Sequence, residues 1–109
     1  INITAGNKVF IYAQAPLRII GSSNAAIVAK LKEGTTASGT VISESNFMNN
    51  GSGATFHSPH FYVALDASPA STSPSYTMTM EKSSGGTTSV SLYSSSTTYV
   101  KMILMEIQG

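Results

Sequence analysis

The sequence Tyr-Thr-Met-Thr-Met-Glu at residues 76–81 alternates apolar and polar side chains with a period of two. This period is typical of a half-buried β-strand, because successive side chains of a strand point to opposite faces. A similar alternation runs through residues 26–32, where Ile27, Ala29 and Leu31 share one predicted face. No stretch of the chain has a helical period or a capping residue before an apolar run. The sequence therefore predicts an all-β chain.

Further strands are predicted between turn signals that recur about every 8 to 14 residues, a spacing typical of a β-sandwich or barrel. The predicted strands are residues 8–15, 17–20, 26–32, 41–44, 61–65, 76–81, 89–93 and 99–107. Pro16 is expected to end the first of them, and Gly85-Gly86 to close a hairpin between residues 76–81 and 89–93. Residues 49–53 and 66–74 are predicted loops. We expect an antiparallel β-sandwich of about eight strands.

The composition narrows the function classes. Ser and Thr make up about a quarter of the 109 residues, whereas charged residues make up 10% and the net charge is +1. The six basic residues are scattered from Lys8 to Lys101, so the sequence predicts no basic patch for nucleic acid. No apolar run approaches the roughly 18 residues of a membrane span, so no membrane insertion is expected. Because the chain begins at Ile1 rather than Met, we expect residues 1–109 to be a single domain of a longer protein.

The last predicted strand, residues 99–107, is apolar on both faces. One face is predicted to carry Val100, Met102 and Leu104. A strand exposed on one side would alternate apolar with polar residues, and the core of a sandwich covers only one face of a strand. The second face is therefore expected to be an oligomer interface, made of Tyr99, Lys101, Ile103, Met105 and Ile107. The alternative is a central strand whose second face is covered by the chain's own loops.

Candidate chemical sites are few. His57 and His60 are the one pair that suggests a metal, but they would share an ion only if the chain turned between them and a third ligand joined. Two exposed loop histidines are the simpler interpretation, so we expect no metal and no cofactor. The chain lacks a Gly-x-Ser-x-Gly elbow and has no carboxylate pair at a suggestive spacing. We expect no catalytic residues and no enzyme activity. Lys30, Lys32 and Glu33 are predicted to form a solvated strand edge.

Several segments occur together in a recognisable order. The second half contains Leu-Asp-Ala-Ser-Pro at residues 65–69, a tyrosine-led strand at 76–80 and Met-Glu-Ile at 105–107. The first half contains Gly-Asn-Lys-Val-Phe-Ile at 6–11 and Glu-Gly-Thr at 33–35. Together these segments resemble the C-terminal β-domains of tail-fibre and head-decoration proteins of tailed phages. The resemblance implies a trimeric jelly roll of the tumour-necrosis-factor or C1q type, in which the C-terminal strand lies mid-sheet and contributes to the subunit interface.

The resemblance also implies a function. It implies a non-enzymatic C-terminal domain on the outer surface of a virion, working as a homotrimer at a fibre tip or as a capsid decoration. Its partners would be further copies of itself, together with a host receptor or glycan, or other virion proteins. Residues 47–59 match nothing in that family, so we expect a receptor or lattice contact at Asn49, Asn50, Ser52 and Phe56. The alternative is a carbohydrate-binding or adhesion module of a secreted bacterial protein, which predicts a monomer with an exposed aromatic platform or a calcium site.

Overall fold

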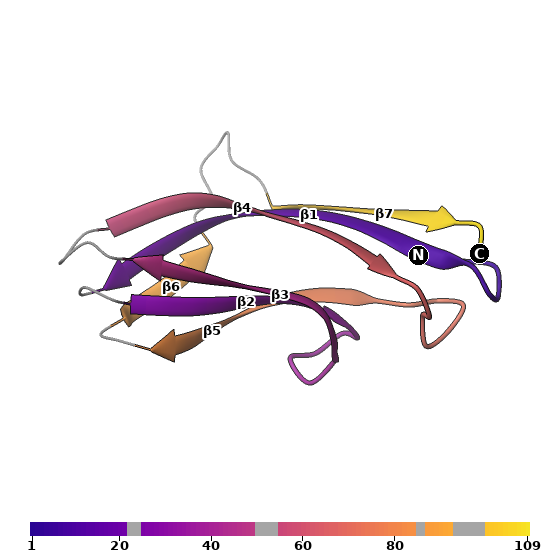
Figure 1. The fold of residues 1–109 in the computed structure, drawn as a ribbon, viewed down its shortest axis with the longest axis horizontal. Coiled ribbons are helices and arrows are strands. Elements are labelled where there is room, and N and C mark those ends of the chain that lie inside the picture. The colour runs from indigo at the N-terminus through magenta and orange to yellow at the C-terminus, as the bar shows by residue number, and fades with distance from the viewer. Residues whose placement is uncertain (22–24, 50–54, 85–86, 93–99) are drawn as a thin grey trace.

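The computed structural model describes residues 1–21, 25–49, 55–84, 87–92 and 100–109. These residues form seven strands and no helix: β1 (Lys8–Gly21), β2 (Ala25–Glu33), β3 (Thr40–Asn49), β4 (Thr55–Asp66), β5 (Tyr76–Ser84), β6 (Thr87–Leu92) and β7 (Lys101–Ile107). The strands make two antiparallel sheets that lie one over the other (Figure 1), as in a β-sandwich. The predicted all-β class is confirmed. The expected count of about eight strands is one more than the described residues contain.

The first sheet, sheet A, is organised around the 14-residue strand β1. One edge of β1 pairs with β4, and the other edge pairs with β7 along Lys8–Gln14 and with β6 along Leu17–Gly21. The second sheet, sheet B, has the order β3-β2-β5. Among the described strands β7 pairs only with β1, so it does not lie mid-sheet as the resemblance implied. The jelly-roll order stays a prediction.

Pro16 does not end a strand, contrary to the expectation from sequence. It lies inside β1, opposite Pro59 of β4. On its other side the pairing with β7 stops at Gln14 and the pairing with β6 starts at Leu17. Proline cannot donate a backbone hydrogen bond, and here the missing donor falls in the gap between two partner strands. The two predicted strands 8–15 and 17–20 are therefore one continuous strand.

The expected hairpin between β5 and β6 is also corrected. β5 pairs with β2 in sheet B, whereas β6 pairs with β1 in sheet A. The chain therefore passes from one sheet to the other between these two strands. Alternation along a strand identifies its buried face but does not identify the strand beside it.

The core lies between the two sheets and takes alternate residues from the two central strands. Its fully buried side chains include Val9, Ile11, Ala13 and Leu17 from β1, and Ile27, Ala29 and Leu31 from β2. The predicted shared face of Ile27, Ala29 and Leu31 is therefore confirmed. Met102 and Leu104 of β7 pack against this core from sheet A, and Met78 and Met80 of β5 pack against it from sheet B.

The sandwich is elongated, with extents of 49 × 29 × 19 Å. Its radius of gyration is 15.5 Å, compared with about 13 Å for a compact domain of this length. Both termini lie at one end, and β1, β3 and β5 all finish at the other (Figure 1). The predicted loop between β4 and β5 lies at the end with the termini. Backbone hydrogen bonds tie it there, from Ile3 N to Thr72 O at 2.9 Å and from Gly34 N to Ser75 O at 2.7 Å.

Candidate functional site

The outer face of sheet A carries a continuous layer of large apolar side chains across β4, β1 and β7. The register places Phe10 between Leu65 and Met105, and Tyr12 between Val63 and Ile103. Residues opposite each other in antiparallel strands share a face of the sheet, so these side chains are neighbours. We refer to this layer as the apolar face; it consists of Phe10, Tyr12, Phe61, Val63, Leu65, Ile103, Met105 and Ile107.

The apolar face is open to solvent in a single chain. Its six residues from β4 and β7 are exposed, from 40% at Ile107 to 63% at Val63, and Phe10 and Tyr12 of β1 are half-buried between them. The rings of Tyr12 and Phe61 lie 6.4 Å apart at 39°. Taking the roughly 200 Å² of an aromatic side chain as an upper limit for each residue, six side chains near half exposure present at most roughly 600 Å². That is the upper end of the largest apolar patch on an ordinary monomer.

Charged and amide groups lie only at the border of the apolar face. Lys8 is paired with Ile107 at one end of it, and Gln14 lies between Phe61 and Lys101 at the other. The two rows in between, centred on Phe10 and Tyr12, contain no charged residue. Lysine can lay its aliphatic stem along such a surface and keep its ammonium group in water. The arrangement is an apolar centre with a sparse polar rim.

The structure places the predicted interface residues of β7 on this face. Lys101, Ile103, Met105 and Ile107 point outward and are exposed, whereas Met102 and Leu104 pack inward. The two-faced character of the strand is thereby confirmed, and its contact with other copies stays a prediction. Val100 precedes β7 and lines the same cavity as Met102, but it is 49% exposed and therefore not buried. Tyr99 lies outside the described residues.

Sequence reasoning missed the contribution of β4. Phe61, Val63 and Leu65 extend the apolar face by a full strand, and all three are exposed. A signal for them exists, because residues 61–65 read Phe-Tyr-Val-Ala-Leu and are apolar at every position. A strand that is apolar on both faces needs a packing partner on each face. This requirement applies to residues 61–65 as it does to residues 99–107.

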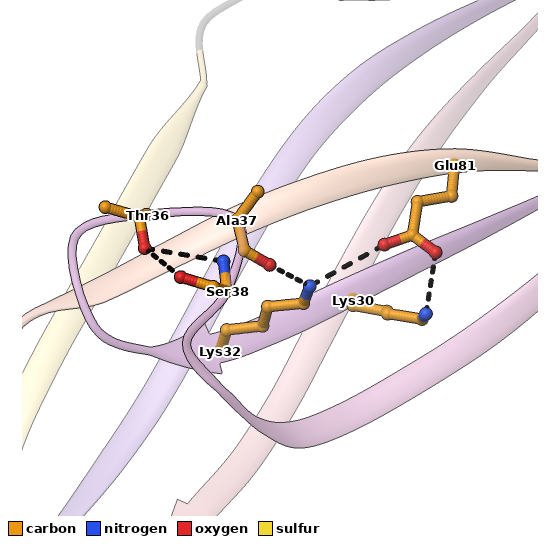
Figure 2. Close-up of polar contacts among 6 residues, drawn as sticks. All are labelled: Lys30, Lys32, Thr36, Ala37, Ser38 and Glu81. Carbon is orange, nitrogen blue, oxygen red and sulfur yellow. Dashed lines mark hydrogen bonds and ion pairs between the residues drawn. The ribbon is translucent and has the colours of Figure 1, made fainter.

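The outer face of sheet B carries two lysines that pair with one glutamate. Lys30 Nζ lies 2.7 Å from Glu81 Oε2, and Lys32 Nζ lies 3.6 Å from Glu81 Oε1 and donates to the Ala37 carbonyl (Figure 2). The hydrogen bond from Lys30 lowers the pKa of the Glu81 carboxyl, and the same bond raises the pKa of Lys30. The expected solvated edge is wrong: β2 is the central strand of sheet B, and Lys32 is only 6% exposed.

Asp66 and Tyr76 form a partly buried polar contact, the arrangement that most resembles a chemical site among the described residues. The Tyr76 hydroxyl donates to Asp66 Oδ2 at 3.0 Å, and the Ser68 backbone N–H donates to Asp66 Oδ1 at 3.2 Å. Burial, followed by the hydrogen bond to this carboxylate, raises the pKa of Tyr76. Both carboxylate oxygens are thus occupied by donors from the β4–β5 loop and the strand after it. This pair joins the two strand ends that flank the loop.

The two histidines lie on a strand. His57 and His60 belong to β4, paired with Arg18 and Ala15 of β1, so the chain does not turn between them as a shared metal ion would require. Their side chains lie outside the described part of the structure. Among the residues that are described, no group of three or more His, Cys, Asp and Glu comes together.

The predicted contact loop is described only at its borders. Asn49 is the last residue of β3 and Phe56 is the second of β4, and both strand ends lie away from the termini (Figure 1). Asn50 and Ser52 lie outside the described residues, as do the side chains of Asn49 and Phe56.

An apolar cavity of about 290 Å³ opens between the sheets at the β5 and β7 edge. Four of its lining residues are Met78, Met80, Val100 and Met102.

Within the described ranges, no helix has the length and apolarity of a membrane span. No protein-family model, no curated protein and no solved structure matches this chain.

Proposed function

We propose that this chain is a non-enzymatic domain on the surface of a phage virion, held in its assembly by the apolar face. The observation that carries the proposal is the exposure of the apolar face. At about 25 cal/mol per Å², covering roughly 600 Å² is worth about 15 kcal/mol. Association costs roughly 4–15 kcal/mol or more in lost freedom, so covering the whole face is of the size needed to offset that cost and covering a small part of it is not.

The virion assignment draws on the resemblance of residues 65–69, 76–80 and 105–107, which also supports a homotrimer as the working form. The shape supports display. The termini lie at one end of a 49 Å sandwich, and β1, β3 and β5 finish at the other (Figure 1). A domain attached through the end with the termini would present the opposite end to its surroundings. Receptor binding at a fibre tip and capsid decoration both fit this arrangement.

Labelling of particles tests the proposal. An antibody raised against the purified chain should decorate the outside of intact virions in immuno-electron microscopy. Absence of label, or label that appears only after the particles are disrupted, would contradict a surface location. The purified chain should also compete with virions for host cells if it is a fibre tip, and should instead bind capsids that lack it if it is a decoration.

A carbohydrate-binding module is the second candidate, favoured by one corner of the apolar face. Phe61 contacts Tyr12 and lies beside Gln14, which in turn pairs with Lys101. Aromatic faces stack on sugar rings, and the amide and ammonium groups can bind hydroxyl groups. This candidate predicts a monomer that binds a glycan and loses that binding in Phe61→Ala. A glycan array with the wild-type chain and this variant decides the matter.

A further inference from the structure

We propose that a second copy of this chain covers the apolar face, and that β4 takes part in the contact on equal terms with β7. The inference rests on the proposed function, in which the apolar face is an assembly surface. It goes further by placing the contact between copies on the apolar face and half of that contact on Phe61, Val63 and Leu65. The β4 residues do not follow from the terminal strand alone.

The first argument is composition. The apolar face and its polar border together comprise eleven outward positions on β4, β1 and β7, of which eight are apolar and three are Lys8, Gln14 and Lys101. Interfaces between partners that also exist apart are about as apolar as ordinary protein surface, whereas homodimer interfaces are more apolar. A face with so few polar groups fits a permanent partner, and another copy of the same chain is always made alongside it.

The second argument is area. A stable interface buries about 800 Å² on each partner. The exposed residues of β7 alone supply roughly half of the 600 Å² estimated for the apolar face, which is too little for a lasting contact. With Phe61, Val63 and Leu65 included, together with the polar border, the surface approaches the standard size. The contact therefore needs both strands.

The third argument is charge. Lys8 and Lys101 lie at the border of the apolar face, so copies can approach its centre without burying an unpaired lysine. On the opposite side of the molecule, Lys30 and Lys32 are paired with Glu81 and need no partner chain. The two outer faces thus differ in kind. Sheet A would face the other copies, and sheet B would face water.

Two matched substitutions test the inference. Val63→Lys places a charge in the β4 part of the apolar face, beside Tyr12, and Val41→Lys places the same charge on an exposed valine of β3 in sheet B. In sedimentation equilibrium, the wild-type chain and Val41→Lys should have the same assembled mass. Val63→Lys should be a folded monomer, with its dissociation constant raised at least 100-fold. Circular dichroism should show the same strand content in all three.

The outcomes separate this inference from the proposed function. If Met105→Lys dissociates the assembly and Val63→Lys does not, the contact belongs to β7 alone and the inference is overturned while the surface role stands. If the wild-type chain is monomeric at high concentration, the second copy is overturned, and the labelling of virions still tests the surface role independently. Should Val63→Lys fail to fold, Val63→Thr keeps a strand-forming side chain of similar shape. A dissociation constant equal to that of the wild type in Val63→Thr would also overturn the inference.

Discussion

Replacing Tyr76 with Phe removes the hydroxyl that donates to Asp66 Oδ2 at 3.0 Å and keeps the ring packed against the core. Asp66 is 8% exposed, and its other oxygen accepts only at 3.2 Å from the Ser68 N–H. Removing one partner from a buried acceptor costs about 1–3 kcal/mol. For a domain of this size that corresponds to a Tm lower by roughly 5–15 °C. The end of β4 and the start of β5 would lose the side-chain hydrogen bond that joins them.

The pH dependence of the protein's stability provides a second test of the same prediction. The pKa of Tyr76 is raised in the folded protein above its ordinary 10.0, first because the hydroxyl is buried and next because it donates to Asp66. Because the pKa is raised, the stabilisation that the protonated Tyr76 hydroxyl contributes is complete below pH 10 and is lost as the pH rises beyond it. The wild-type chain should therefore lose more stability than Tyr76→Phe between pH 9 and pH 11.

Thermal denaturation of both proteins at pH 7 and at alkaline pH measures these differences, at one fixed protein concentration because association changes Tm. Tyr62 also has a raised pKa, mainly through burial. It is present in both proteins, so only the difference between them reports on Tyr76. A Tm at pH 7 unchanged within about 1 °C, or an identical alkaline loss in both proteins, would refute the reasoning.

Two further predictions concern the end with the termini and the core. Glu106 Oε1 accepts from Thr4 N at 2.6 Å and from Asn7 Nδ2 at 2.7 Å, and the Thr4 bond in particular lowers the pKa of this carboxyl below 4.5. Its contribution is present above pH 4.5 and is lost as the pH falls through the lowered value. The protection factor of the Thr4 amide, which is its exchange rate relative to an unfolded chain at the same pH, should therefore fall below pH 4.5, whereas that of the Gly34 amide should not change. Leu31→Ala empties a fully buried site of β2 and should lower the free energy of unfolding in urea by about 2–5 kcal/mol; a loss below 1 kcal/mol would show that Leu31 is not central to the core.

Secondary structure was predicted most accurately from the sequence for strands in which apolar residues alternate with polar ones. Residues 26–32 and 76–81 alternate, and both are strands. Ile27, Ala29 and Leu31 are buried as expected, and Met78 and Met80 pack partly buried against the core. The prediction at Pro16 was wrong, because a local rule cannot see that the proline faces a gap between β6 and β7. The partner of β6 could not be predicted either, since pairing depends on contacts between segments far apart in the chain.

Only the β7 part of the apolar face could be predicted from the sequence. The odd-numbered residues of β7 were assigned to an outward face because residues 99–107 are apolar on both sides. The same pattern at residues 61–65 identified a strand but not its neighbour. Only the register, which sets Val63 beside Tyr12 and Tyr12 beside Ile103, joins the two segments into one surface.

Thiol accessibility tests the central claim most directly. The chain contains no cysteine, so Val63→Cys and Val41→Cys each introduce a unique thiol, at positions 63% and 45% exposed in a single chain. Their rates of reaction with a charged maleimide can be compared at concentrations where the chain is assembled and after dilution to monomer. If copies cover the apolar face, Val63→Cys should react at least ten times more slowly than Val41→Cys while the chain is assembled. After dilution to monomer, the two variants should react at the same rate. Equal rates under both conditions would contradict the account.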